Sequence, residues 1–423
     1  MARPPDITID DFSSPRFAPD VAEIMASVGP LAEAISLTPE PLLEQAASQT
    51  GLSDFGDDRF LEPLGIVCRA LTSEADLSAM GVVSAQATLV QLLKSRLLVQ
   101  DLLHRHPEIL ELPVRAPIII AGLPRTGTTH LHNLMSADPA LRSLPYWESQ
   151  QPVLGEGEVP PAGGADPRLA TTDAALEFLN HAAPYFVRMH EMTTWHVHEE
   201  IGLLAMDFST MFFETMGNLP SYRDWYMATD QTDAYRYLRT VLQVLQWTRG
   251  GSRWVLKSPQ HMEQFTAIRA VFPDATVAIT HRDPVSVTAS LAVMMTYLAR
   301  LSVEHPDPRK IGRYWADRVQ TLLSACQRDR DVLPAEQSID VPFHEFMADD
   351  LAMVARIYAV AGQPLGSDAR AAMEAFMADH PRGRHGRVHY DLSEFGLDGD
   401  ERRQAMMGYI DRFGLRQEEL NQP

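Results

Sequence analysis

Hydrophobic positions in the first quarter of the chain repeat with the period of a helix. Leu89, Leu93 and Leu97 recur at four-residue steps, and Leu92 lies three residues after the first of them. Side chains at these spacings share one face of an α-helix. The pattern ends in a His-Pro and a Leu-Pro pair, which are turn signals. We therefore predict that residues 1–112 form a helical cap region that packs on the main domain.

After residue 113 the hydrophobic pattern changes to short apolar runs that alternate with helical stretches. Runs at 118–120, 254–256 and 275–280 are each followed by a polar loop and a helix-like pattern, and 338–343 is a later strand candidate. Alternation of this kind predicts an α/β fold, in which a parallel sheet is flanked by helices on both faces. Residues 113–423 are assigned to this domain.

Two of these runs are followed by residues that suit a helix start. Ser258 and Asp283 are each followed by a proline. Serine and aspartate accept hydrogen bonds at the N-cap, and proline suits the first helical position. We predict that both residues cap helices.

A long stretch of different composition separates the first strand from the second. Residues 152–167 are rich in Pro, Gly and Ala and predict a loop, and about 168–250 predicts a helical insertion. Aromatic and Met residues concentrate in 206–216 and 221–227. The insertion is expected to cover the site and form an acceptor pocket, although the same residues would also suit the core of a helical layer.

Composition excludes some partners. The chain has 423 residues, 45% of them hydrophobic and 22% charged, and its net charge of −20 opposes binding to nucleic acid. Its two cysteines, Cys68 and Cys326, provide neither a disulfide framework nor metal-ligand spacing. The polar start at 1–11 has no signal-peptide character, and the run 116–123 is too short for stable membrane insertion. A cytoplasmic location is expected.

A glycine loop follows the first predicted strand. Residues 122–129 fit the P-loop spacing G-x-x-x-x-G-x-[ST], between a strand and a helix. In such a loop, backbone N–H groups and the helix N-terminus surround an anion. Thr128 stands where nucleotide hydrolases carry a lysine, and Arg125 is the loop's only cation. The loop thus predicts a P-loop-like fold whose anion is smaller and less charged than a triphosphate.

With Pro-Arg-Thr-Gly-Thr-Thr inside it, this loop resembles the 5′-phosphosulfate loop of sulfotransferases that use PAPS (3′-phosphoadenosine 5′-phosphosulfate), in particular the bacterial members and the tyrosylprotein branch. The resemblance implies that Arg125, Thr126, Gly127, Thr128 and Thr129 hold the phosphosulfate.

Two further motifs extend the resemblance over about residues 55–400. The family's 3′-phosphate motif pairs an arginine after a strand with a serine eight residues later, as Arg282 and Ser290 do here. An arginine fork suits a phosphate monoester. Trp-Val-Leu-Lys-Ser-Pro at 254–259 resembles the family strand whose lysine, here Lys257, approaches the transferring group.

A basic run near the C-terminus is unusual in so acidic a chain. Residues 381–387 read Pro-Arg-Gly-Arg-His-Gly-Arg. In related enzymes a basic glycine-containing loop closes over the 3′-phosphate, which implies that Arg382, Gly383 and Arg384 contact the nucleotide. The alternative is a solvated surface loop.

Sulfuryl transfer is mainly a matter of positioning and charge stabilisation. We expect in-line displacement, with Arg125 and Lys257 stabilising the developing charge, PAP (the desulfated nucleotide) as product and no metal. For the general base, Glu148 matches the catalytic glutamate of the tyrosylprotein and glycan branches and is favoured over an orienting role toward the loop arginine. The alternative base lies in the cluster His196, His198 and Glu199, where adjacent carboxylates could raise the pKa of a histidine. For His198 and Glu199 the other interpretation is a hydrogen-bonded structural role.

The acceptor is expected to be the hydroxyl of a small, hydrophobic molecule, because the insertion is rich in Met and aromatic residues. A P-loop nucleotide kinase or NTPase is disfavoured by Thr128, and a non-catalytic nucleotide-binding scaffold is disfavoured by the intact Lys257, Arg282 and Ser290. The short C-terminal dimer motif of the family's cytosolic branch is not found, so no oligomeric state is predicted.

Overall fold

A parallel four-stranded sheet forms the centre of the domain. The computed structural model of the chain describes residues 3–161 and 163–420. The sheet has the order β3-β2-β4-β5, and its strands are β2 (Ile118–Ala121), β3 (Val255–Ser258), β4 (Thr276–His281) and β5 (Ser338–Pro342). The predicted α/β class is confirmed, because all three neighbouring pairs are parallel.

Each face of the sheet is covered, which explains the continuous apolar runs. Along β2, Ile118 and Ile120 belong to one hydrophobic cluster, and Ile119 and Ala121 belong to another. Successive side chains of a strand point to opposite faces, so a strand buried on both sides is apolar at every position. The flanking helices of the domain are α6 (Thr128–Ser136), α12 (Phe265–Val271), α13 (Pro284–Ala299), α14 (Pro308–Asp329), α15 (Phe343–Ala348), α16 (Asp350–Ala361), α17 (Ser367–Asp379), α18 (Gly399–Ala405) and α19 (Met407–Phe413).

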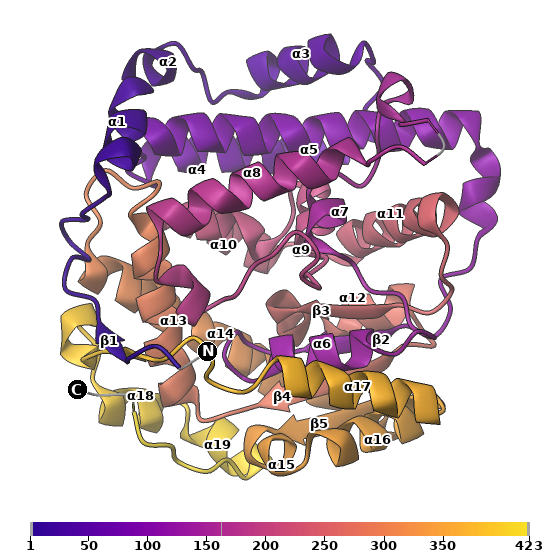
Figure 1. Cartoon of the computed structure of the whole chain (residues 1–423), viewed down its shortest axis with the longest axis vertical. Helices are drawn as coiled ribbons and strands as arrows, with labels where there is room; N and C mark the ends of the chain where they lie inside the picture. The colour runs from indigo at the N-terminus through magenta and orange to yellow at the C-terminus, as the bar shows by residue number, and fades with distance from the viewer. Residues whose placement is uncertain (1–2, 162, 421–423) are drawn as a thin grey trace.

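The N-terminal region is helical, as its periodicity predicted. Leu89, Leu93 and Leu97 are fully buried in α5 and share one continuous core with Ile119 of the sheet. The layer lies at the top of Figure 1, away from the sheet. Its helices are α1 (Pro19–Ser27), α2 (Gly29–Glu33), α3 (Pro39–Thr50), α4 (Leu61–Ser73) and α5 (Ala79–Arg105). In the described part of the chain, α5 alone is long and apolar enough to cross a membrane, and half of its apolar window is buried inside the protein.

The two ends of the chain meet. β1 (Ile7–Thr8) pairs in parallel with β6 (Val388–His389), directly after the basic run 381–387. Arg188 of the insertion donates to the Pro5 carbonyl at 2.7 Å. Residues 5–8 therefore pack with the C-terminal part of the chain and not with the helical layer that follows them.

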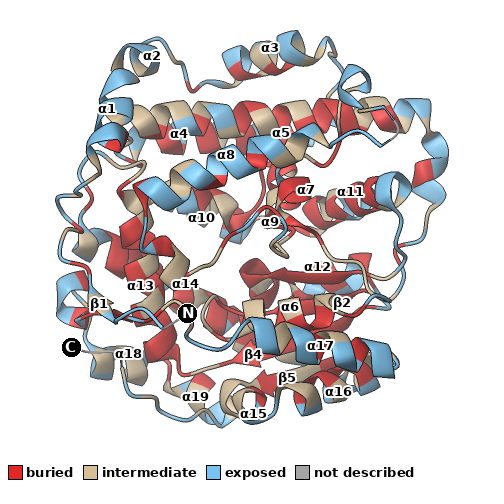
Figure 2. Cartoon of the chain, in the orientation of Figure 1, coloured by how far each residue is buried: buried red, intermediate tan, exposed pale blue. Residues whose placement is uncertain are grey.

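The insertion contains helices, and its Met and aromatic residues have mixed roles. Met206 and Phe213 are buried in the core, whereas Met211 and Phe212 line the main cavity. Figure 2 shows the buried inner faces of these helices. The helices between the first two sheet strands, apart from α6, are α7 (Tyr146–Gln150), α8 (Pro167–Ala182), α9 (Ile201–Leu204), α10 (Pro220–Ala228) and α11 (Thr232–Arg249).

One of the two predicted helix caps is correct. Asp283 accepts a hydrogen bond from the Val285 amide at 3.2 Å at the start of α13. Ser258 precedes a short 3₁₀ helix with Pro259 in its first turn, but its side chain makes no capping bond. Ser258 is fully buried at the end of β3, and its hydroxyl has no hydrogen-bond partner among the described residues.

Candidate active site

The glycine loop connects β2 to α6 and has the tight curvature expected of an anion-binding loop. Gly127 and Arg125 have φ angles of 88° and 72°, in the left-handed region. A Cβ on Gly122 would lie 1.8 Å from the Thr280 hydroxyl oxygen, so only glycine fits there. The Thr126 hydroxyl is buried in hydrogen bonds of 2.6 Å with the Leu123 carbonyl and with Thr280. Its side chain therefore shapes the loop instead of facing a ligand.

A cavity of about 1360 Å³ opens above this loop. Its lining brings together predicted site residues that lie far apart in the sequence. The predicted site residues that line it are Arg125, Gly127, Thr128, Thr129, His198, Lys257, Arg282, Ser290, Arg382, Gly383 and Arg384. The cavity is thus large enough for a nucleotide and a second ligand together.

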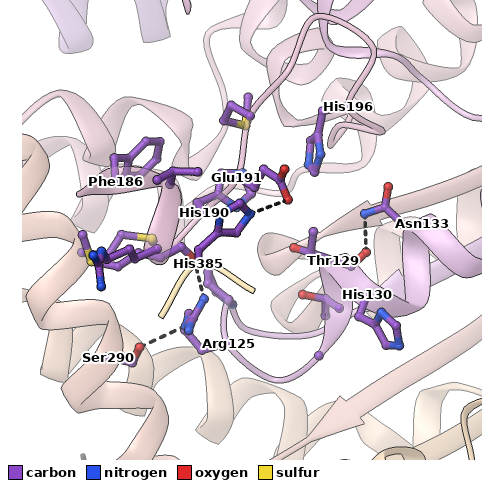
Figure 3. A pocket seen from close by; sticks show the side chains of 18 of the residues that line it. Arg125, Thr129, His130, Asn133, Phe186, His190, Glu191, His196, Ser290 and His385 are labelled. Atoms are coloured by element: carbon purple, nitrogen blue, oxygen red, sulfur yellow. Dashed lines mark hydrogen bonds and ion pairs between the residues drawn. The ribbon is translucent and has the colours of Figure 1, made fainter. Parts of the chain in front are cut away.

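Two guanidinium groups meet beside the loop. Arg125 donates from Nε to the Ser290 hydroxyl at 3.0 Å and from Nη1 to the Met189 carbonyl, and Figure 3 shows the contact with Ser290. Arg282 donates to the Arg125 carbonyl and lies 4.0 Å from the centre of the Phe343 ring. Burial, with a smaller effect from Arg282, lowers the pKa of Arg125 to about 10. Among the described residues no carboxylate contacts Arg125, so a bound anion would relieve this unfavourable positive charge.

Lys257 enters the cavity from the end of β3. Its ammonium pairs with Glu199, and its backbone N–H donates to Glu200 at 2.9 Å. Glu200 also pairs with the buried His261, whose other ring nitrogen lies 2.6 Å from the Tyr235 hydroxyl. Burial by itself would raise the pKa of Glu200, but the partner His261 outweighs it and the pKa falls below its ordinary value. Glu200 therefore anchors the end of β3, whereas Glu199 faces the cavity with Lys257.

Glu148 lies outside the cavity. It is fully buried, and Arg142 donates to both of its carboxylate oxygens at 2.8 and 2.7 Å. Arg249 adds a contact of 3.1 Å. Because its carboxylate is held by two arginines and does not line the cavity, the geometry gives no support to Glu148 as the base. The sequence also suggested that Glu148 could orient Arg125 of the glycine loop. In the structure Glu148 contacts Arg142 and Arg249 instead.

Comparison with known proteins agrees with this arrangement. Residues 117–367, more than half of the chain, match the family model of the sulfotransferase family. The chain belongs to the sulfotransferase family. No curated protein sequence matches the chain at a significant level.

Two solved structures resemble this sulfotransferase over most of their length. Sulfotransferase STF1 from Mycobacterium tuberculosis H37Rv is 30% identical, with 88% of this chain and 98% of that chain covered and a TM-score of 0.77. Sulfotransferase STF9 from Mycobacterium avium is 29% identical, with 92% and 99% covered and a TM-score of 0.79. The likeness includes the N-terminal helices and not only the sheet domain.

In the sulfotransferase cavity the pKa values of His196 and His198 are lowered, contrary to the rise expected from their carboxylate neighbours. Removal from water, followed by the charge of Lys257, lowers the pKa of His196 to about 4. Burial and other nearby histidines hold the pKa of His198 well below its ordinary value. The adjacent carboxylates have little influence because Glu199 and Glu200 contact Lys257 and His261 instead. These imidazoles are neutral at physiological pH.

Most cations assigned to the nucleotide have carboxylate partners that the sequence did not reveal. Arg282 is held by both oxygens of Glu418, at 2.6 to 3.0 Å. Arg384 pairs with Glu191, and Arg382 pairs with Asp350. None of these carboxylates is near its arginine in sequence, and no motif marks them. They counterbalance positive charge in the ligand-free protein.

Proposed function

We propose that this sulfotransferase transfers the sulfuryl group of PAPS to the hydroxyl of a small hydrophobic acceptor. The meeting of Arg125, Ser290 and Arg282 beside the glycine loop carries the proposal. A 5′-phosphosulfate would occupy the loop, where backbone amides and the N-terminus of α6 favour an anion. The 3′-phosphate would take the place of Glu418 on Arg282, because both present two oxygens to the guanidinium fork. A cytoplasmic location fits the unpaired Cys68 and Cys326 and belongs to the proposal.

The reaction needs charge stabilisation at the sulfuryl group. The acceptor oxygen forms a bond to sulfur while the bond from sulfur to the 5′-phosphate oxygen breaks, which leaves PAP and a sulfate ester. Lys257 and Arg125 would stabilise negative charge on the sulfuryl oxygens and on the leaving phosphate. Both cations are largely shielded from water, where such interactions are strong.

Glu199 is the base in this proposal. It lines the cavity and contacts Lys257, so it lies where the acceptor and the sulfuryl group would meet. The neutral histidines are weak bases here because their pKa values are depressed. When the Lys257 ammonium turns to the sulfuryl oxygens, the Glu199 carboxylate becomes available to accept the hydroxyl proton.

An apolar wall supports a hydrophobic acceptor. It comes from α8 and the later part of the insertion, from α13 and from α14. Its members are Leu179, Phe186, Met189, Met192, Met211, Phe212, Met294, Met295, Leu298 and Trp315. Methionines adapt to ligands of varied shape, which fits an apolar alcohol or phenol better than a sugar.

Calorimetric titration with PAP, ATP and ADP, with and without Mg²⁺, tests the nucleotide. PAP is expected to bind without Mg²⁺ and more tightly than ATP or ADP, because Arg282 and Ser290 recognise a 3′-phosphate. Preference for ATP with Mg²⁺ would contradict the proposal. A screen of hydroxyl compounds with radiolabelled PAPS then identifies an acceptor.

Glu199→Gln tests the base. The amide cannot accept the proton, so kcat is expected to fall by about 10²- to 10⁴-fold, while the Kd for PAP changes little. Radiolabel transfer and calorimetry measure the two quantities. The control is Glu191→Gln, which removes a carboxylate from the same cavity at the arginine-rich end. Unchanged kcat in Glu199→Gln would refute the assignment.

The Glu418 contact predicts opposite effects of two substitutions on PAP binding. Arg282→Ala should weaken binding by about 100-fold, because a partly buried charge partner of the phosphate is lost. Glu418→Gln should strengthen binding by about three- to tenfold, since its ion pair with Arg282 no longer competes with the phosphate. Calorimetry checks both. As a control, Glu419→Gln removes the same charge from the next residue and should leave the Kd for PAP within about twofold of the parent value. If Glu418→Gln and Glu419→Gln change the Kd equally, the effect comes from net charge and not from the contact with Arg282.

A further inference from the structure

Three histidines that the proposed chemistry does not use converge in the cavity. His190, His196 and His198 each offer one ring nitrogen, and these nitrogens all lie within 4.8 Å of one another. All three belong to the segment between α8 and α9, and Figure 3 shows His190 and His196 beside the glycine loop. The rings meet edge to face, with centroids 5.5 Å apart for His190 and His196. Rings that meet edge to face can direct their nitrogens toward a common point, which stacked rings cannot do.

The state of these rings suits a metal ligand set. Each ring is partly buried and lines the cavity. A neutral imidazole offers the lone pair of one ring nitrogen to a metal ion. The buried Nδ1 of His198 has no hydrogen-bond partner among the described residues. A buried polar atom without a partner is costly and indicates a missing ligand.

We propose that His190, His196 and His198 bind one divalent transition-metal ion of the Zn²⁺ class, with a fourth position open to the cavity. Three imidazoles with one open position is the ligand set of catalytic zinc sites. With Zn–N bonds near 2.0–2.1 Å, tetrahedral ligands lie about 3.4 Å apart. The nitrogens therefore need to approach by at most about 1.4 Å, which side-chain rotation in a loop segment supplies.

The charged residues around the three histidines affect how favourably a cation binds there. Lys257 is the nearby cation that acts on all three rings, and its ammonium is neutralised by Glu199. Glu191 lies on the same segment, and its carboxylate pairs with Arg384 and His385. Arg125 donates to the carbonyl of Met189, next to His190, so the metal and the bound nucleotide would lie on either side of this segment.

The role of the ion rests on the proposed function. The open position would bind the acceptor oxygen and lower the pKa of its hydroxyl. Glu199 would take the proton, the oxygen would attack sulfur, and the S–O bond to the 5′-phosphate would break. The oxygen of the sulfate ester would then dissociate from the metal, which stays on the three histidines with its oxidation state unchanged. An oxygen-binding site of this kind would favour phenols and other weakly acidic alcohols among hydrophobic acceptors.

Metal binding is tested without any acceptor. The full chain is stripped with a chelator, dialysed and titrated with Co²⁺, whose visible absorption reports tetrahedral imidazole ligation, and then with Zn²⁺ as a competitor. One ion per chain is expected, confirmed by elemental analysis after Zn²⁺ loading. His196→Asn and His198→Asn should each weaken Co²⁺ binding by more than about 100-fold. His130→Asn, a histidine of the same cavity outside the cluster, should not change it.

PAP calorimetry on the same samples separates the possible outcomes. If the chain and the variants bind PAP but no Co²⁺ band appears, the metal site is refuted and the proposed function stands. If Co²⁺ binds and PAP does not, the proposed function fails and the site remains. Equal loss of Co²⁺ binding in His130→Asn and His196→Asn would also overturn the assignment to these three residues, and retained PAP binding shows that each variant is folded.

Discussion

Lys257→Met is expected to lower kcat by about 10²- to 10³-fold, the loss typical of removing one charge-stabilising donor from a shielded site. Methionine keeps the length and apolar stem of lysine but not its ammonium. The ammonium lies at the end of β3, 4% exposed, beside Glu199 and across from the glycine loop. Arg125 is held by Ser290 and the Met189 carbonyl, so it would keep its own position and would not take the place of the lost ammonium. Radiolabel transfer from PAPS measures the loss.

A surface lysine provides the control. Lys310→Met changes the same side chain at an exposed position in α14 and should leave kcat unchanged. The Kd for PAP should rise far less than kcat falls in Lys257→Met, since the sulfuryl group is absent from PAP. If kcat in Lys257→Met stays within about threefold of the parent enzyme, Lys257 has no role in charge stabilisation.

Glu148→Gln is expected to destabilise the protein by about 3 kcal/mol and to leave kcat nearly unchanged. The carboxylate is fully buried between Arg142 and Arg249, and Arg142 is itself only 11% exposed. A neutral amide would leave a buried guanidinium uncompensated. Chemical denaturation measures the free energy of unfolding, and radiolabel transfer measures kcat at a temperature where the variant is folded.

Comparing Glu148→Gln with Glu199→Gln distinguishes the two candidate bases. One glutamate is predicted to matter for stability and the other for turnover, so the two variants should show opposite patterns. A large loss of kcat in Glu148→Gln with unchanged stability would restore Glu148 as the base. Glu336→Gln, in an exposed turn before β5, controls for loss of a surface carboxylate and should change neither quantity.

Local patterns were sufficient for the sheet and the phosphate-type motifs. The apolar runs at 118–120, 254–256 and 275–280 each fall on or overlap a strand, because a strand buried on both faces must be apolar at consecutive positions. The glycine loop was recognisable because its backbone needs Gly122 for close approach and Gly127 for a positive φ. Both features depend only on the backbone conformation of a short segment, so the residue types in that segment are enough to predict them.

The base could not be assigned in the same way. Glu148 has the expected spacing from the loop, but its direction depends on Arg142 and Arg249, and the second of these lies at the end of α11. The predicted rise in the histidine pKa values is also wrong, because residues adjacent in sequence are not the partners in space. In the folded chain Glu199 pairs with Lys257 of β3, and burial has the largest effect on the pKa of His196.

By itself, the sequence determined the α/β class, the glycine loop and the motifs that indicate sulfuryl transfer, because each depends on backbone needs within a short segment. Tertiary structure alone decided which carboxylates hold Arg282 and Lys257, which glutamate is sealed in the core, and that three histidines share one point of the cavity. Charge partners and ligand clusters depend on distances across the fold. Those distances are set by packing of helices and strands far apart in the chain, which no local pattern encodes.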